Sequence, residues 1–575
     1  MQQTPNQSTS ASSVSGTGHA CAHCSQAFDV TEEDLQMLDA LSPIIGGKKY
    51  PLPPPTICPE ERERMRLAQT NHINLYERTC DLSGEKMISS ISPDKPFKVY
   101  KQEQWYSDRW DPLEYGKEFD FSRPFFDQFK ELSWSVPKPA LFTAFQYDEN
   151  CAYTNNAGKN KNCYLIFDSD ENRDCYYSYS LNGCVDCSDC YRARKCTLCC
   201  ECIDCVQCYE SIYLQDCENC SNSAFLKNCI GCKNCLMCSN LRNKEYYVEN
   251  KKVTPEQFAE YRALLGSRKS LQRAGERFAK LKLEYPQKYI HGVQIENVVG
   301  DYLVNSKNAY MCFDSEDLWD CRYVYQGFMP LKNCMDLQEC GEGERLYNCS
   351  VVGYNANSLI GCDQCLQQVS DLLYCTHCFH CTNCFGCSGL RNRKYCIFNK
   401  QYTKEAYDAL AGKMIEHMQK TNEWGQCLPM EMSMFGYNES TVQEYFPLTK
   451  QDVEARGWMW SPVPEQKDAH PGPFSNVPDD IGDTTEAVCK GIYQCPVTKK
   501  AFKIVEQELE LAQKLHIPLP VTSFFQRHKE RMALRNPRKL WKRTCSKCSK
   551  EVITSYAPER PEEIVCEECY AKAVY

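Results

Sequence analysis

The sequence predicts a multidomain, β-rich α+β protein in which a duplicated, cysteine-rich, narrow β-solenoid-like core is flanked by zinc-ribbon modules and short helices. Three observations lead to this prediction. The chain of 575 residues contains 42 cysteines, and most of those in its middle are spaced three residues apart. That middle is a tandem duplication, and the two ends of the chain are related by a second duplication. Internal repeats indicate repeat architectures, and the length corresponds to about four domains.

Composition restricts the class of protein. Charged residues make up 25% and hydrophobic residues 42% of the chain, and no apolar run approaches the ~18 residues of a membrane span. Residues 1–18, rich in Gln, Ser and Thr, are predicted to be a disordered tail rather than a secretion signal. We therefore expect a cytoplasmic protein in a reducing compartment, where CxxC pairs indicate metal or free thiols more often than disulfides. The net charge of −10 argues against a uniformly basic nucleic-acid binder.

The first duplication defines cysteine-rich repeats over 131–252 and 291–401. The segments 161–164, 167–169 and 174–175 reappear as 307–310, 313–315 and 320–321. Each copy leads into a predicted helix, near 254–265 in a helical connector over 253–290, and near 403–418 in a helix over 402–425. Residues 426–484 are predicted to be a linker that wraps the core.

The second duplication relates the terminal modules, 19–130 and 485–575. In the C-terminal module, a predicted strand over 551–555 separates two CxxC pairs at zinc-ribbon spacing. Four thiolates satisfy tetrahedral Zn²⁺ at ~2.3 Å and leave no open position, so we expect a structural zinc there. Unmetallated or redox-active thiols are the alternative. The expected ligands are Cys545, Cys548, Cys566 and Cys569.

The N-terminal module carries an incomplete ligand set. Cys21, Cys24 and Cys58 supply three thiolates, and Glu61 stands at the CxxC partner position of Cys58; His19 and His23 are other candidates for a fourth ligand. A three-cysteine zinc site and a lost ancestral site both fit. Each module also retains one cysteine of the site that its counterpart keeps, namely Cys80 and Cys495.

A basic stretch precedes the C-terminal ribbon. Basic helices beside zinc ribbons often contact nucleic acid, where each neutralised phosphate contributes about −0.9 to the salt slope. The alternative is a solvated helix that pairs with the protein's own acidic surface. The candidate contacts with RNA or a ribonucleoprotein are Arg527, Lys529, Arg531, Arg535, Arg538, Lys539, Lys542 and Arg543.

The three-residue spacing of the central cysteines matches neither a flat strand nor an α-helix. It fits a chain that turns a corner every few residues. Fourteen of the thirty-one central cysteines directly follow Asn or Asp, residues that tolerate corner conformations. The predicted corners include Asn162, Asp174, Asp216, Asn228, Asp320 and Asn333.

Three interpretations of the central thiols remain open: free, packed side chains; a soft metal such as zinc; and redox disulfides or an iron–sulfur cluster. Ala309 replaces Cys163 in the second copy, which favours packing, because alanine can replace a buried thiol but not a ligand. The most plausible metal ligands are Cys229, Cys232, Cys235 and Cys238 with their counterparts Cys378, Cys381, Cys384 and Cys387.

Aromatic segments are predicted to wrap or cap the core, around Trp105, Trp110 and 119–126, and again around 445–448 and Trp458. With the segments 92–97, 105–112 and 119–125, the Asn-Cys and Asp-Cys repeats and the terminal ribbon, the chain resembles a family of cysteine-rich proteins from small-genome, candidate-phylum bacteria. Members are sometimes labelled CaiB/BaiF, but no residues here support CoA transfer. The resemblance implies zinc-ribbon ends and no established activity.

These observations lead to two hypotheses. The first is a non-enzymatic, zinc-stabilised scaffold with RNA or a ribonucleoprotein as partner through the basic stretch. The second is a thiol-redox or metal-handling protein that uses the CxxC arrays. An enzyme of ordinary type ranks third, because the sequence contains no glycine-rich phosphate loop, nucleophile elbow or metalloprotease helix.

Overall fold

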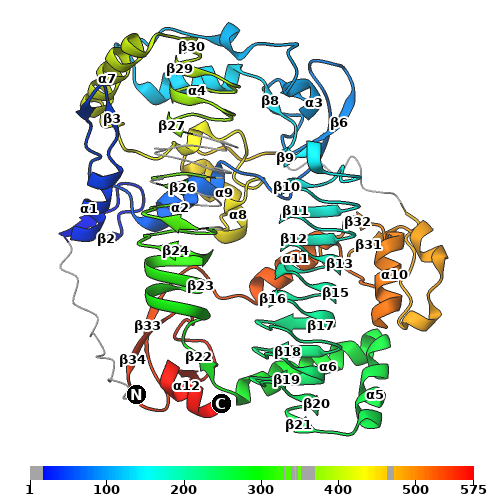
Figure 1. Ribbon diagram of the computed structural model, residues 1–575. Helices are drawn as coiled ribbons and strands as arrows, with labels where there is room; N and C mark the ends of the chain where they lie inside the picture. Colours follow the sequence, from blue (N-terminus) through cyan, green and yellow to red (C-terminus); the bar gives the residue numbers. More distant parts are fainter. Residues whose placement is uncertain are drawn as a thin grey trace.

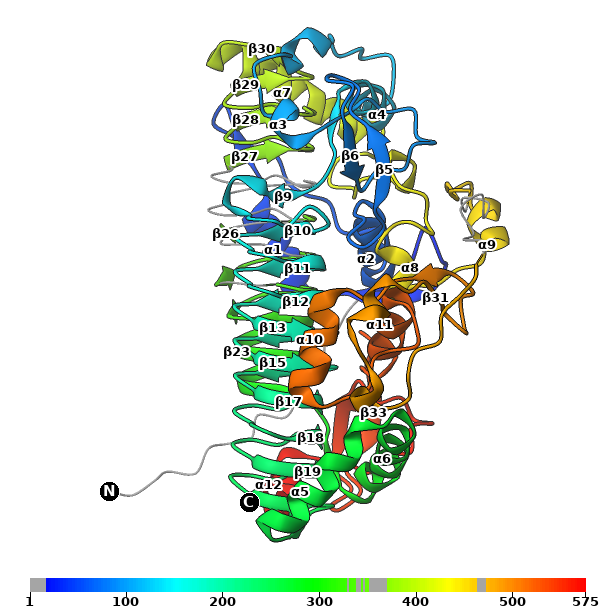
Figure 2. The ribbon, with the colours of Figure 1, turned by 90° about the vertical axis from the view of Figure 1, so that its right-hand side faces the viewer.

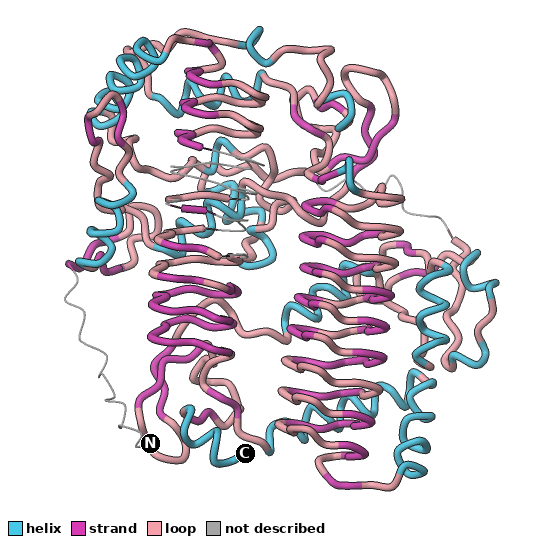
Figure 3. The backbone as a smooth tube through the Cα atoms, viewed as in Figure 1, coloured by secondary structure: helices cyan, strands magenta, loops and turns pink. Residues whose placement is uncertain are grey.

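The computed structural model describes residues 17–327, 330–337, 343–344, 347–350, 370–462 and 472–574. It is a mixed α/β, strand-rich structure in which two stacks of short parallel strands stand side by side and run in opposite directions (Figure 1, Figure 3). Helices of both terminal modules lie against one side of the stacks (Figure 2). Within the described residues, no helix is both long and apolar enough to cross a membrane. Residues 1–16 of the predicted tail and 463–471 of the predicted linker lie outside the described residues.

The first stack belongs to a sheet of thirteen strands. From β10 to β20 the pairing is parallel and joins residues twelve positions apart, such as Tyr164 with Tyr176 and Tyr176 with Ser188. Six of these strands, β12, β13, β15, β17, β16 and β14, close into a parallel barrel. The strands are β9 (Thr143–Ala144), β10 (Asn155–Gly158), β11 (Tyr164–Asp170), β12 (Tyr176–Asn182), β13 (Val185–Ser188), β14 (Tyr191–Arg194), β15 (Thr197–Cys200), β16 (Ile203–Val206), β17 (Tyr209–Gln215), β18 (Ala224–Lys227), β19 (Lys233–Ser239), β20 (Glu245–Val248) and β21 (Lys251–Lys252).

The second stack repeats this register over most of its described pairs, with a step of thirteen residues between Leu318 and Leu331. Ser370 pairs with Thr382, and Thr382 pairs with Lys394, again twelve residues on. Its described strands are β23 (Gly292–Glu316), β24 (Leu318–Trp319), β25 (Leu331–Lys332), β26 (Gly343–Glu344), β27 (Ser370–Leu373), β28 (Thr382–Phe385), β29 (Lys394–Ile397) and β30 (Lys400–Gln401).

Left-handed corners explain the three-residue spacing in the sequence. Every third residue from Asn156 to Glu249 has a φ between 45° and 64°, a region that residues other than Gly, Asn and Asp rarely adopt. A turn of twelve residues therefore has four corners and four short sides. The prediction that Asn and Asp mark the corners is confirmed, because a positive φ is found at Asn162, Asp174, Asp216, Asn228, Asp320 and Asn333.

The residue after a corner can link successive turns through its side chain. The Ser223 hydroxyl donates to the carbonyl of Ser221 (2.8 Å) and accepts from the backbone N–H of Cys235 (3.0 Å), one turn later. The Cys238 thiol likewise donates to the Leu236 carbonyl (3.3 Å) and accepts from the next turn. An inward Cys or Ser thus offers both a donor and an acceptor, which Ala or Leu cannot.

The modules and connectors contain the remaining helices and strands. The N-terminal part has β1 (Thr17–Ala20), β2 (Ala27–Val30), α1 (Glu32–Leu41), β3 (Ile44–Ile45), β4 (Lys48–Lys49), α2 (Pro59–Ala68), β5 (Tyr76–Thr79), β6 (Lys86–Ser89), β7 (Val99–Tyr100), α3 (Gln102–Trp105), α4 (Phe125–Ser135) and β8 (Lys138–Pro139). The connectors have α5 (Pro255–Ala263), α6 (Arg268–Leu281), β22 (Gln287–Lys288), α7 (Lys404–Lys420), α8 (Val442–Tyr445) and α9 (Lys450–Ala455). The C-terminal part has β31 (Tyr493–Gln494), β32 (Ala501–Phe502), α10 (Glu506–Leu515), α11 (Phe524–Ala533), β33 (Trp541–Thr544), β34 (Glu551–Thr554), β35 (Ile564–Val565) and α12 (Glu567–Val574).

The helices that follow the repeats lie where the sequence predicts them. Thr254 caps α5 in a capping box with Gln257, and the Thr403 side chain accepts the Ala406 N–H at the start of α7. A threonine that satisfies a free N–H of the first turn fixes the start of each helix.

Each terminal module contacts both stacks in a crossed arrangement. In the N-terminal module, β7 pairs with β8 just before the first stack, yet Arg62 of α2 reaches Asp336 of the second stack (2.6 Å). In the C-terminal module, β35 pairs with β22 just before the second stack, while Arg527 of α11 reaches Asp189 of the first (2.8 Å). Each module therefore pairs beside one stack through a short parallel strand pair and docks on the other through an arginine.

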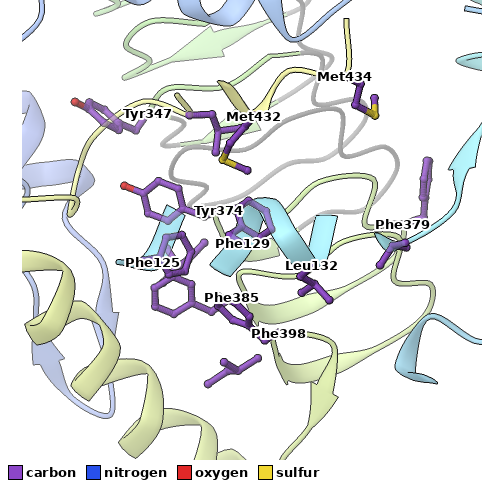
Figure 4. Close-up of a cluster of buried hydrophobic side chains, with 14 of the residues drawn as sticks. Phe125, Phe129, Leu132, Tyr347, Tyr374, Phe379, Phe385, Phe398, Met432 and Met434 are labelled. Carbon is purple, nitrogen blue, oxygen red and sulfur yellow. The ribbon is translucent and has the colours of Figure 1, made fainter. Parts of the chain in front are cut away.

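The predicted aromatic wrap covers one end of the second stack. Phe125 of α4 packs against Phe385 and Phe398, with ring centroids 5.4 and 5.6 Å away, inside a large buried cluster (Figure 4). The later segment behaves differently, because Trp458 stacks on Tyr437 (5.8 Å) and packs with α2 of the N-terminal module rather than on a stack end.

Candidate metal centres in the terminal modules

The four cysteines predicted for the C-terminal ribbon converge. The sulfurs of Cys545, Cys548, Cys566 and Cys569 all lie within 4.8 Å of one another, and those of Cys548 and Cys566 are 3.7 Å apart. A tetrahedral ion with metal–sulfur bonds of ~2.3 Å requires sulfur–sulfur edges of about 3.8 Å. The tetrad therefore fits one tetrahedral metal ion and would fill its coordination shell.

Local structure prepares the tetrad for metal. Cys545 follows β33, and Cys566 directly precedes α12 and donates its N–H to the Cys545 sulfur (3.3 Å). Burial opposes ionisation of Cys545, but N–H groups of Cys566, Cys548 and Lys547 outweigh it and lower the pKa of Cys545 to about 6. Since metals bind the thiolate, this shift favours the ligand form of Cys545, whereas burial and the neighbouring thiols raise the pKa of Cys569 to about 12.

The N-terminal triad has the same geometry with one ligand fewer. The sulfurs of Cys21, Cys24 and Cys58 lie within 4.8 Å of one another. Cys24 and Cys58 are 3.8 Å apart, and the Cys58 N–H donates to the Cys21 sulfur (3.3 Å). These values match the tetrad, so the triad fits three corners of a tetrahedron.

The expected fourth ligands of the triad do not join it in this structure. No ligand atom of Glu61, His19 or His23 lies within 4.8 Å of all three sulfurs. Glu61 is turned toward Arg64, with its Oε1 3.1 Å from the Arg64 Nε.

The two single cysteines each accept one N–H in the way that the first cysteine of an intact site does. The Cys80 sulfur accepts the Lys101 N–H (3.3 Å), and the Cys495 sulfur accepts the Ser523 N–H. Both bonds correspond to the N–H that the second knuckle donates in the intact sites. Lys101 and Ser523 therefore stand where a second-knuckle cysteine would be needed.

The eight central cysteines named as further candidate ligands do not form a compact site. Within the described parts of the chain, the tetrad and the triad are the cysteine groups that converge within 4.8 Å. The eight are buried, and their thiols donate to backbone carbonyls two residues earlier. Burial raises the pKa of Cys229 well above its usual range, whereas hydrogen bonds with Cys378 and Cys384 lower the pKa of Cys381 to about 4. The geometry therefore favours packed, hydrogen-bonded thiols at Cys229, Cys232, Cys235, Cys238, Cys378, Cys381, Cys384 and Cys387.

Four of the eight residues predicted to contact nucleic acid are buried inside the molecule, which removes them from such a role. The side chains of Arg527, Arg531, Arg535 and Arg538 are at most 6% exposed and pair with the protein's own carboxylates. The alternative prediction, that this helix pairs with the protein's own acidic residues, therefore holds for these four arginines, although the ion pairs are buried and not solvated. Lys529, Lys539 and Lys542 are exposed, and Arg543 donates to the carbonyls of Ala557 and Glu562.

These arginines form contacts that the sequence analysis missed. Arg535 lies 2.7 Å from Asp204 of the first stack and 2.6 Å from Asp314 of the second. Arg538 lies 2.7 Å from Asp314 and 2.7 Å from Glu63 of α2. The segment that leads into the C-terminal tetrad thus joins both stacks and both modules. One feature of the sequence could have indicated these internal ion pairs. Arg527 and Arg62 are related by the same offset as the rest of the terminal duplication, which indicates a role common to both modules.

No protein-family model matches the chain, and no curated protein matches its sequence.

Proposed function

We propose that this protein is a non-enzymatic scaffold, in which zinc-stabilised terminal modules hold two narrow β-solenoid arms side by side. The observation that carries the proposal is the convergence of Cys545, Cys548, Cys566 and Cys569. Four thiolates fill a tetrahedral shell and leave no position for a substrate, as in structural zinc sites. A d¹⁰ ion without redox chemistry suits a role of this kind.

The buried ion pairs support a mechanical role for the modules. Arg535 and Arg538 connect Asp204, Asp314 and Glu63, which come from the two stacks and the opposite module. Removal of one partner from a buried, hydrogen-bonded pair costs about 3–5 kcal/mol, because the other charge is left buried. The relative position of the stacks therefore depends on the module that the tetrad organises.

A nucleic-acid partner does not form part of the proposal, because the arginines that suggested it are occupied. The thiol-redox alternative is disfavoured by the central thiols, which donate hydrogen bonds to carbonyls and are buried. Redox pairs would react quickly with alkylating reagents, whereas thiols of a packed core react slowly in native protein.

Elemental analysis of the purified protein tests the proposal. One to two zinc ions per chain are expected, and Cys569→Ser should remove one of them. A protein without bound metal, or one that keeps its metal count after this substitution, would refute the assignment. Four or more ions would place metal in the stacks.

A further inference from the structure

We infer that the N-terminal triad binds its metal as a Cys₃–carboxylate site, with Glu61 as the fourth ligand. This inference rests on the proposed metal-stabilised scaffold and deepens it. It assigns a divalent, zinc-like ion to a second centre with a chemistry different from that of the tetrad.

The two centres are built alike. In each, the first cysteine of the second knuckle donates its N–H to the first cysteine of the first knuckle at 3.3 Å. In each, the second knuckle runs directly into a helix, α2 after Cys58 and α12 after Cys566. Cys569 stands in the first turn of α12, and Glu61 occupies the same position in α2. The fourth ligand of the tetrad and Glu61 are therefore equivalent by register.

Glu61 is an unusual buried acid. The residue is 3% exposed, and its backbone N–H donates to the Cys58 sulfur, as a knuckle requires. Its Oε1 pairs with Arg64, but among the described residues its Oε2 has no hydrogen-bond partner. A buried carboxylate oxygen without a partner is costly, and a metal ion in the triad would satisfy it.

We expect a rotation of the Glu61 side chain away from Arg64 to bring a carboxylate oxygen to the open corner of the triad. Carboxylate oxygens bind zinc at about 2.0–2.2 Å, beside thiolates at ~2.3 Å. Arg64 is not left alone when Glu61 turns away, because its Nη1 also donates to the Tyr437 hydroxyl (3.0 Å). A carboxylate is a harder ligand than a thiolate, so this centre should hold zinc less tightly than the tetrad.

Titration of the full-length apoprotein with Co²⁺ tests the inference. Two equivalents of Co²⁺ should bind, and the tighter one should occupy the tetrad. The weaker equivalent is assigned to the triad if it is lost in Cys24→Ser. Glu61→Ala should weaken the second equivalent tenfold or more, the loss that even outer-shell changes produce. Glu61→Cys should tighten it and raise its sulfur-to-cobalt absorption by about a third, because four thiolates replace three.

Glu60→Ala is the matched control, since Glu60 lies in the same helical turn with its side chain 48% exposed. It should leave both equivalents unchanged. An affinity and spectrum unaltered by Glu61→Ala would overturn the inference, and so would a second equivalent that Glu61→Cys does not change. If the unmodified chain did not bind the first, tighter equivalent of Co²⁺ at the tetrad, the proposed function itself would be contradicted. Failure of the inference about Glu61 and failure of the proposed function are therefore distinguishable. If Glu61→Ala fails to fold, the Glu61→Cys spectrum still decides.

Discussion

Replacement of Cys387 by serine and by alanine tests why the stacks contain cysteine. The Cys387 thiol donates to the Phe385 carbonyl (3.4 Å) and accepts the Asn399 N–H of the next turn (3.4 Å). Both Cys387 and Asn399 are fully buried. The Phe385 carbonyl also accepts the Phe398 N–H, so alanine would leave one buried group without a partner, the N–H of Asn399.

The expected difference follows from that one group. An unsatisfied buried N–H costs about 1–3 kcal/mol, and the lower half of this range applies because sulfur is a weak acceptor. Serine keeps the donor and the acceptor, as Ser223 shows in the first stack. Both variants lose about the same packing volume. We therefore expect Cys387→Ala to be less stable than Cys387→Ser by about 1–2 kcal/mol, which corresponds to a five- to thirtyfold difference in the equilibrium constant for local opening.

Hydrogen exchange of the Asn399 amide is the suitable assay, because a chain of several cooperative units does not unfold in two states. Exchange at Asn399 should be faster in Cys387→Ala than in Cys387→Ser. The same order is expected at Asn250 for Cys238, its counterpart in the first stack. Substitutions of Cys489, outside the stacks, should leave both amides unchanged. If the thiols were only apolar filling, the order would reverse, because a buried hydroxyl without partners is worse than alanine.

Three further predictions follow from the ion pairs and the metal. Burial raises the pKa of Glu201, beside Arg531, and of Glu508, beside Arg527, to about 7, so the folded state binds more protons than the unfolded state between about pH 4.5 and 7. The stability of the packing of α11 on the first stack should therefore fall as pH rises through this window, and Glu508→Gln should flatten the dependence in exchange measurements. Arg535→Ala should destabilise the contact between the stacks by about 3–5 kcal/mol, seen as faster proteolysis between them, and unchanged proteolysis would refute the bridge. A chelator should accelerate amide exchange in β33, β34 and α12 but not in β12–β19; loss of protection in those strands would place metal inside the stacks.

The sequence revealed the corners and the helices because they depend on local chemistry. An Asn or Asp before a cysteine signals a left-handed residue wherever it occurs, as at Asn228, and a threonine cap marks the start of α5 and α7. The tetrad could also be predicted from the sequence, because the spacing of its two CxxC pairs restricts how four sulfurs can converge. The hydrogen bonds of the inward thiols could not be predicted from the sequence, since they depend on which N–H lies one turn away from each sulfur.

The crossed arrangement of modules was also beyond the sequence. The two duplications show that Arg62 corresponds to Arg527 and that the repeats correspond to each other, but not which module docks on which repeat. The basic stretch around Arg535 therefore suggested an exposed patch. Its acidic partners, Asp204 and Asp314, are scattered among the repeats and become neighbours only when the stacks stand side by side.

The crossed docking has a consequence for the order in which a ribosome releases the chain. The partner of Arg62, Asp336, is made 274 residues later. At synthesis rates of about 5–20 residues per second, α2 emerges about 14–55 s before its binding surface exists. During that interval the Arg62 guanidinium lacks its acidic partner, and a metal ion in the proposed N-terminal site would keep this segment ordered until the second stack is made.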